Sequence, residues 1–95
     1  MTSGGIRAVH GFVSGRVQGV GFRYSAVRAA QSCNVHGWVR NTMDGRVEVF
    51  AQGAPDGISR MVAWLKKGPP TAMVESFEYG FTAAQSNIRS FRITY

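Results

Sequence analysis

The stretch RAVHGFVSGRVQGVGFRYSAVRAAQSC, residues 7–33, decides the fold because it contains a strand, a loop and a helix in turn. Arg7–Ser14 predicts a strand, since small or apolar residues share one face at Val9, Gly11 and Val13. Gly15–Gly21 is rich in glycine and predicts a loop. Phe22–Cys33 predicts a helix, because four residues recur at helical spacing: Phe22, Ala26, Ala29 and Cys33. Asn34 predicts a left-handed end to this helix.

Two strands joined by a turn follow this unit. The segments VHGWVRN (Val35–Asn41) and RVEVFA (Arg46–Ala51) predict strands. Between them, Thr42–Gly45 carries the turn pair Asp44-Gly45, so the two strands are expected to form a hairpin. The alternation in the second strand predicts that one face exposes Arg46, Glu48 and Phe50.

A second helix and two more strands complete the pattern. Asp56 is expected to cap a helix over Gly57–Lys67, whose apolar stripe consists of Ile58, Met61, Val62 and Leu65. Gly68-Pro69-Pro70 ends this helix, because proline cannot continue it. Val74–Phe81 predicts a fourth strand and Phe91–Tyr95 a short fifth.

The resulting element order is β-α-β-β-α-β with a short C-terminal strand. It predicts an α+β, ferredoxin-like split βαβ fold, in which two helices cover one face of an antiparallel sheet. We expect residues 1–6 to form a flexible N-terminal tail and residues 7–95 to form a single domain. Enzymes, RNA-binding modules and regulatory domains all use this fold, so it does not assign a function.

Composition limits the class of protein. Hydrophobic residues make up 44% and charged residues 17% of the 95 residues, as in globular domains. No apolar run reaches the roughly 20 residues of a membrane span. The single cysteine, Cys33, excludes an internal disulfide. Met1–Gly5 lacks the apolar core of a signal peptide, so we expect a cytoplasmic protein. The net charge of +6 favours anionic partners, although solubility alone also explains it.

Several common kinds of site are absent from the sequence. There is no GxxxxGK[ST] motif, and the glycines of residues 15–21 do not fit GxGxxG. His10 and His36 fall in predicted strands without a cysteine or carboxylate at ligand spacing, so we expect structural or surface roles rather than metal binding. Cys33 is expected to pack on its helix rather than act as a nucleophile. The five carboxylates show no pairing that suggests acid–base chemistry.

The glycine-rich loop remains as the main candidate site. A chain that turns at glycines directs backbone N–H groups into one concavity, and the following helix adds free N–H groups and the positive end of its dipole. Such a site favours phosphate, whereas the alternative is that the glycines only permit a tight turn. Arg23 favours the phosphate interpretation, because the dipole disfavours a cation in the first helical turn unless an anion lies beside it. The alternative is a solvated arginine.

Asn41 is the second candidate residue. By pattern alone it is a polar residue at a strand end, typical of a turn. Its side-chain amide is also able to accept a hydrogen bond from a water and donate one to a phosphoryl oxygen at the same time. In that interpretation Asn41 positions a water molecule.

Two segments resemble the signatures of the acylphosphatase family. The first is GRVQGVGFR, Gly15–Arg23, and the second is GWVRNT, Gly37–Thr42, followed by Asp44-Gly45 and Val47-Glu48-Val49. The likeness extends in order over Arg7–Tyr95 and includes two further segments, Gly68-Pro69-Pro70-Thr71-Ala72 and Phe91-Arg92-Ile93. The sequence departs from the family's pattern only near the end of the first helix, at Ser32-Cys33 and Asn34.

The resemblance implies a hydrolase that cleaves the carboxyl–phosphate bond of acylphosphates, without a cofactor, a metal or a covalent intermediate. It implies that Arg23 binds the phosphoryl oxygens and that Asn41 orients the attacking water. The phosphate is then held by the backbone N–H groups of Arg16, Val17, Gln18, Gly19, Val20 and Gly21. The expected partners are a small-molecule acylphosphate and, as site ligand, inorganic phosphate or sulfate. We expect a monomer with neither a membrane nor a nucleic-acid partner.

This chemistry is consistent with the groups that the sequence lacks. The leaving carboxylate has a pKa near ~4, so no general acid is needed to protonate it. A loose phosphoryl-transfer transition state requires in-line positioning and charge stabilisation more than a strong base. A loop, one arginine and one asparagine suffice in principle, and a phosphoryl oxygen of the substrate is a candidate base.

Two other classes of function stay open on the sequence. One is a nucleic-acid-binding module, favoured by the positive charge and the fold. Against it, Gly11-Phe12-Val13 only faintly resembles an RNA-binding motif, and the strand Arg46–Ala51 offers a single aromatic residue. The other is a regulatory relative without turnover, against which the presence of both Arg23 and Asn41 argues. Trp38 and Trp64 are expected in or near the core rather than as partner anchors.

Overall fold

The computed structural model describes residues 5–95. Five strands and two helices follow one another along the chain: β1 (Arg7–Arg16), α1 (Phe22–Cys33), β2 (His36–Asn41), β3 (Val47–Gly53), α2 (Pro55–Lys67), β4 (Met73–Thr82) and β5 (Phe91–Ile93). This order is the expected β-α-β-β-α-β with a short C-terminal strand. Most of the expected tail, residues 1–6, lies outside the described residues.

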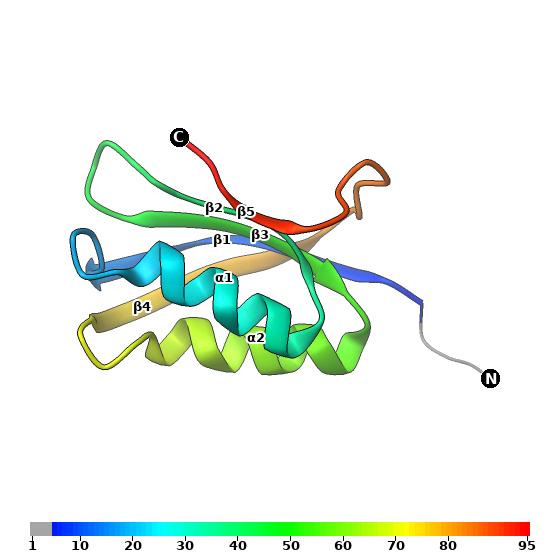
Figure 1. The fold of residues 1–95 in the computed structure, drawn as a ribbon, viewed down its shortest axis with the longest axis horizontal. Coiled ribbons are helices and arrows are strands. Elements are labelled where there is room, and N and C mark those ends of the chain that lie inside the picture. The colour runs from blue at the N-terminus through cyan, green and yellow to red at the C-terminus, as the bar shows by residue number, and fades with distance from the viewer. Residues whose placement is uncertain (1–4) are drawn as a thin grey trace.

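The strands form one sheet in the order β4-β1-β3-β2-β5. The pairs β4–β1, β1–β3 and β3–β2 are antiparallel, whereas β5 runs parallel to β2. Both helices cover the same face of the sheet (Figure 1). The ferredoxin-like α+β prediction, including a short fifth strand, is therefore confirmed, but the parallel pairing of that strand with β2 was not predicted.

Helix α1 has the predicted bounds. One side of it is buried at Phe22, Ala26, Ala30 and Cys33, so the predicted stripe is right except that Ala30 replaces Ala29 in the centre. Asn34 has a φ of 58° and a ψ of 44°, the expected left-handed conformation. Its backbone N–H donates to the carbonyl oxygens of Ala30 and Gln31, which satisfies acceptors that the helix end leaves free.

Helix α2 begins two residues earlier than the sequence predicted. Its N-cap is Ala54, which has an extended backbone and no capping side chain, so the prediction that Asp56 caps the helix is wrong. Pro55 at the first helical position starts the helix, because its ring fixes φ near the helical value. Asp56 instead lies in the first turn, where a carboxylate complements the helix dipole. The helix ends before Gly68, as predicted.

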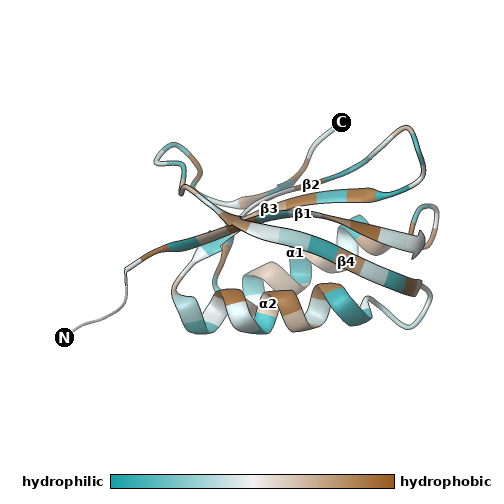
Figure 2. Ribbon diagram, turned by 180° about the vertical axis from the view of Figure 1, so that it is seen from behind, coloured by the Kyte–Doolittle hydropathy of each residue, from teal (hydrophilic) through white to brown (hydrophobic). Residues whose placement is uncertain are grey.

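The core lies between the sheet and the two helices. Valines that alternate along the strands meet the apolar sides of the helices, and hydrophobic residues recur along α2 and the strands in Figure 2. Residues with no exposed surface are Val9, Val13, Ala26, Ala30, Val39, Val47, Val49, Ala51, Met61 and Leu65. Each such valine or leucine stabilises the fold by about 1.5–3 kcal/mol. Neither helix in residues 5–95 has the length and apolar character of a membrane span.

The opposite face of the sheet is less exposed than its pattern predicts. Glu48 exposes 8% and Phe50 only 2% of its surface, so the expectation that both would be exposed is wrong. Trp38 stacks on Phe50 with ring centroids 6.2 Å apart, and the Arg46 guanidinium lies 4.2 Å from the ring centroid of Phe12. The side chains of neighbouring strands therefore cover one another on a face that carries no helix.

Candidate active site

The loop between β1 and α1 lies at one end of the sheet, beside the β2–β3 turn (Figure 1). A β-bulge between Ser14 and Gly15 carries β1 two residues further than predicted, so the loop begins after Arg16. Val17 is buried and anchors the loop in the core. Gly19 and Gly21 have φ values of 74° and 77°, a left-handed conformation that side chains other than glycine rarely adopt.

The backbone N–H groups of this loop are available to a ligand. Within residues 5–95, no hydrogen bond uses an N–H of Gln18–Gly21 as its donor. Gly21 is also the N-cap of α1 and provides no side-chain cap, so the first N–H groups of the helix are free as well. Left-handed glycines that alternate with an ordinary residue form a concave nest of N–H groups. The positive end of the α1 dipole adds to its preference for an anion.

Side-chain hydrogen bonds tie the loop to two other parts of the chain. Nε2 of Gln18 donates to the carbonyl oxygens of Thr42 and Arg46, at 2.8 Å and 2.9 Å, which ties the loop to the β2–β3 turn. The hydroxyl of Thr71 donates to the carbonyl oxygen of Val20 at 2.6 Å. The loop is therefore held in one shape before a ligand binds.

The β2–β3 turn is itself tightly bonded. Hydrogen bonds from the side chains of Arg46 and Thr42 lower the pKa of Asp44 to about 2, so its carboxylate stays ionised near neutral pH. The Thr42 hydroxyl also accepts from the backbone N–H of Arg46 at 3.0 Å. This turn fixes the end of β2, where Asn41 lies.

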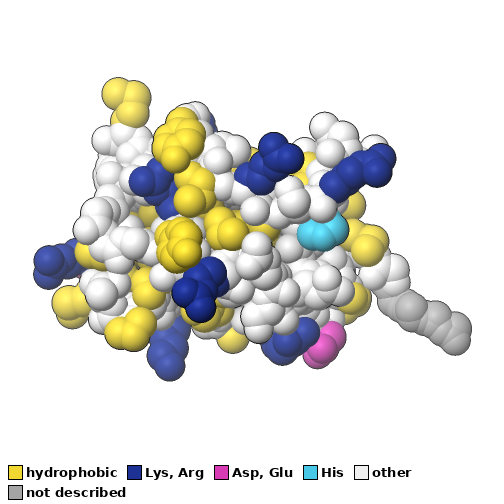
Figure 3. Space-filling view, in the orientation of Figure 1, with side chains coloured by type: hydrophobic (Ala, Val, Ile, Leu, Met, Phe, Trp, Pro, Cys, Tyr) yellow, Lys and Arg dark blue, Asp and Glu magenta, His cyan; other side chains and the backbone are white. Residues whose placement is uncertain are grey.

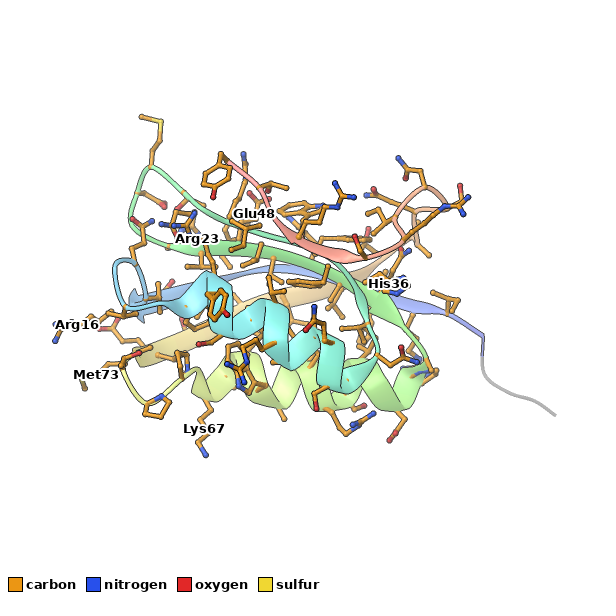
Figure 4. All side chains as sticks on the ribbon, in the orientation of Figure 1. Arg16, Arg23, His36, Glu48, Lys67 and Met73 are labelled. Carbon is orange, nitrogen blue, oxygen red and sulfur yellow. The ribbon has the colours of Figure 1, made fainter. Side chains whose placement is uncertain are left out.

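Arg23 is a half-buried cation in the first turn of α1, which contains no acidic residue. None of the ion pairs found within residues 5–95 includes it. Its guanidinium carbon lies 5.5 Å from the ring centroid of Tyr95. In Figure 4 the Arg23 side chain extends from the start of α1 toward the sheet, whereas Arg16 points outward at the end of the molecule. Arg23 is therefore free to pair with a bound anion.

Asn41 is the last residue of β2 and pairs with Val47 of β3. Its Oδ1 atom is buried, and no hydrogen-bond partner for it exists in the described part of the chain. A buried acceptor without a partner is costly in a folded protein, by about 1–3 kcal/mol. Such an atom is suited to accept a hydrogen bond from a water molecule that the site binds.

One small pocket of about 130 Å³ brings these features together. It is lined by Val17, Gly19, Gly21, Phe22, Arg23, Tyr24, Asn41 and Ile93. Three of the six residues expected to hold phosphate therefore line it, together with Arg23 and Asn41. The other three, Arg16, Gln18 and Val20, lie in or beside the loop without lining the pocket.

Several residues of this region were not predicted from the sequence. Tyr24 and Ile93 line the pocket, Tyr95 faces Arg23, and Thr71 holds the loop. Thr71 and Ile93 stand in two segments that the resemblance includes, Gly68–Ala72 and Phe91–Ile93, but it assigns no role to either residue. No local pattern links Thr71 to Val20, because 51 residues separate them.

The remaining reactive side chains lie elsewhere. His36 is exposed and Cys33 is buried, while Nε2 of His10 donates to Glu48 at 2.6 Å. Across residues 5–95, no three His, Cys, Asp or Glu side chains gather in a way that would hold a metal ion. None of these side chains lines the pocket.

Comparisons with known proteins agree on one family. The family model described as acylphosphatase matches residues 9–93. An acylphosphatase from Trichormus variabilis is 47% identical over 85 residues, which are 90% of this chain and 83% of that protein. An acylphosphatase from Methylococcus capsulatus is 40% identical over 88 residues, 93% of this chain and 96% of that protein.

Solved structures lead to the same family. A Coxiella burnetii acylphosphatase has a TM-score of 0.88 and 36% identity, covering 94% of this chain and 93% of its own. A Bacillus subtilis acylphosphatase has a TM-score of 0.87 and 34% identity, covering 96% and 100%. Since these relatives match along nearly their whole length, the chain belongs to the acylphosphatase family and is a hydrolase of acylphosphates.

Proposed function

We propose that the pocket hydrolyses acylphosphates by direct, in-line attack of a water molecule on a phosphoryl group held by the loop and Arg23. The loop N–H groups that have no partner in residues 5–95 carry this proposal. Gly19 and Gly21 of this loop line the same pocket as Arg23, a cation whose charge no carboxylate of the described chain neutralises. A phosphoryl group, tetrahedral and doubly negative, fits this set of donors.

The loop and Arg23 act as electrostatic stabilisers. Backbone N–H groups cradle the phosphoryl oxygens, with Arg16–Gly21 as the proposed binding segment. Arg23 donates two parallel hydrogen bonds from its planar guanidinium. In the transition state, charge spreads over the equatorial oxygens, and donors that already point at them need no reorganisation.

Asn41 positions the nucleophile. We assign its unpartnered Oδ1 atom to accept a hydrogen bond from the attacking water. The side-chain N–H groups then donate to a phosphoryl oxygen, which aligns the water with phosphorus. A phosphoryl oxygen of the substrate takes the proton of the water as the new P–O bond forms. The C–O–P bridge breaks on the phosphorus side, and the carboxylate departs without protonation.

Because the carboxylate is a good leaving group, the proposed reaction needs neither a general acid nor a metal ion. We expect a purified sample to hydrolyse a simple acylphosphate in buffer that contains a chelator. Arg23→Ala and Asn41→Ala are each expected to lose at least about 100-fold in kcat, in line with the loss of one transition-state donor or positioning group. Both variants should retain the circular dichroism spectrum of the parent.

Arg28→Ala is the matched control, because Arg28 is an exposed arginine on the same helix that does not line the pocket. It should keep the parental kcat. If Arg23→Ala or Asn41→Ala kept it as well, the role assigned to that residue would be wrong.

Inorganic phosphate, or sulfate in its place, is the proposed ligand of the free enzyme. It should inhibit competitively and raise the melting temperature, since a ligand at 100 times its Kd stabilises a protein by about 2.7 kcal/mol. The pocket is built from one chain, and we propose that the protein acts as a cytoplasmic monomer. Size-exclusion chromatography with light scattering and cell fractionation test these two points.

A further inference from the structure

The connection between α2 and β4, residues 68–72, lies at the same end of the molecule as the loop between β1 and α1 (Figure 1). It carries the Gly68-Pro69-Pro70-Thr71-Ala72 segment, for which the proposed reaction has no role. We propose that Thr71 is a positioning residue, which orients the Val20–Gly21 peptide so that the N–H of Gly21 points at the bound phosphate. This inference rests on the proposed function of the loop.

The segment that carries Thr71 is rigid. The N–H of Gly68 donates to the carbonyl oxygen of Trp64 at 2.7 Å, and the N–H of Ala72 donates to that of Pro69 at 3.0 Å. Gly68 has a φ of 73°, and a Cβ there would lie only 2.9 Å from Cε2 of Phe22. The turn is therefore packed against the first residue of α1. Thr71 reaches the loop from a fixed support and loses little entropy in doing so.

The hydrogen bond from Thr71 determines the direction of one loop amide. The Thr71 hydroxyl donates to the Val20 carbonyl oxygen at 2.6 Å, and no peptide bond in the described chain is cis. In a trans peptide the C=O and the next N–H point in opposite directions. With the Val20 oxygen held toward Thr71, the Gly21 N–H points away from Thr71. Gly21 lines the pocket and Thr71 does not, as the inferred direction of this N–H requires.

This restraint matters because the loop backbone is permissive. Gly19 and Gly21 flank the Val20 residue, and a Cβ at either position would meet nothing within 4 Å. The space beside both of these Cα atoms is therefore open. Glycine adopts positive and negative φ with similar ease, so a flipped peptide costs little in the free enzyme. Without Thr71 the nest would spend part of its time with a carbonyl oxygen facing the phosphate.

The test compares Thr71→Val with Thr71→Ser. Valine keeps the shape of threonine and removes the hydroxyl, whereas serine keeps the hydroxyl. We expect Thr71→Val to bind inorganic phosphate about fivefold to tenfold more weakly by calorimetry, the size of one hydrogen bond, with a similar rise in KM for an acylphosphate. Thr71→Ser should restore both. Thr82→Val, at the opposite end of β4 from Met73, is the matched control and should bind phosphate like the parent.

The amide resonance of Gly21 gives a direct readout. In a ¹⁵N-correlated spectrum, phosphate should shift this resonance downfield in the parent and in Thr71→Ser, and by clearly less in Thr71→Val. The inference would be overturned if Thr71→Val bound phosphate as tightly as the parent and if phosphate shifted its Gly21 resonance by as much as in the parent. It would also be overturned if Thr71→Ser failed to restore binding. If the parent itself neither bound phosphate nor shifted at Gly21, the proposed function would fail instead.

Discussion

At the scale of single residues, Arg23 stands out because it breaks a rule of helix stability. A cation in the first turn of α1 faces the positive end of the helix dipole, at a cost of about 0.3–1 kcal/mol. The described chain supplies no carboxylate to offset this cost. The position is favourable only once an anion occupies the pocket. Arg23 therefore lowers the stability of the free protein and favours anion binding.

We therefore expect Arg23→Gln to be inactive and yet no less stable than the parent. In phosphate-free buffer its free energy of unfolding should stay unchanged or rise by up to about 1 kcal/mol, because a neutral side chain relieves the dipole. Urea denaturation monitored by circular dichroism measures this. A loss of more than about 1 kcal/mol would mean that Arg23 holds the fold together. Added phosphate should stabilise the parent and leave Arg23→Gln unaffected.

The sequence identified Arg23 and Asn41 because each carries a signal of its own. Arg23 conflicts with the helix dipole, and both residues stand in segments that resemble the family signatures. Thr71 also stands in a segment of the resemblance, but nothing in the sequence indicates its contact with Val20, because 51 residues separate the two. The role of a residue that binds a distant part of the chain can be recognised only in the folded structure, where the two parts are in contact.

At the scale of elements, a buried carboxylate links the three middle strands. Glu48 of β3 accepts from Nε2 of His10 on β1 at 2.6 Å and from Nε of Arg40 on β2 at 2.7 Å. Burial by itself would raise the pKa of Glu48. The hydrogen bonds from His10 and Arg40 outweigh it, so that the pKa lies below its usual value of 4.5. The ionised form of Glu48 therefore stabilises the sheet.

The sign of this shift sets a pH dependence. A lowered pKa means that the stabilisation is complete above about pH 4.5, the ordinary value, and is lost as the pH falls through the lower pKa of the folded state. We expect Glu48→Gln to cost about 1.5–3 kcal/mol at pH 7, the range for hydrogen bonds to a charged group. The cost should shrink as the parent is taken below pH 4.

Urea unfolding at pH 7, 5 and 3.5 measures this dependence, with Glu78→Gln, an exposed carboxylate on β4, as the control. The control should be close to the parent at every pH. A Glu48→Gln variant that lost the same stability at pH 3.5 as at pH 7 would show that the carboxylate charge has no part in holding the strands.

The sequence predicted elements well where local chemistry determines them. The bounds of α1 follow from its periodic stripe and from Asn34, and the end of α2 follows from Gly68. The sequence did not predict the ends of the strands correctly where strand pairing determines them. β1 extends past its bulge because it continues to pair with β4, up to Arg16 with Met73. The fifth strand is shorter than the predicted Phe91–Tyr95, because only Phe91–Ile93 pair with β2.

At the scale of the whole molecule, positive charge is widely distributed. The net charge is +6, and three of the five acidic residues, Asp44, Glu48 and Asp56, already pair with cations. On the face shown in Figure 3, lysine and arginine side chains surround hydrophobic ones and acidic side chains are sparse. Such a surface attracts an anionic substrate from a distance.

We therefore expect kcat/KM to fall by roughly tenfold between low ionic strength and about 0.5 M salt, while kcat changes little. Screening shortens the reach of surface charges to a few ångström at high salt, but acts weakly on the enclosed contacts of the pocket. Initial rates in sodium chloride measure this. The double variant Arg28→Gln/Arg60→Gln should start from a lower kcat/KM and respond less to salt. Equal salt responses in parent and variant would exclude steering by these charges.

The position of β1 in the sheet has a consequence for how the protein forms. The strand lies between β3 and β4, and its residue Ala8 pairs with Thr82 near the other end of the chain. Contacts between such distant residues form slowly, typically over milliseconds to seconds. On a ribosome, the first strand to emerge must wait for its last neighbour to be synthesised. Until then the edge of β1 that later pairs with β4 is exposed. The nascent chain depends on its early helix, its charge or a chaperone to avoid aggregation.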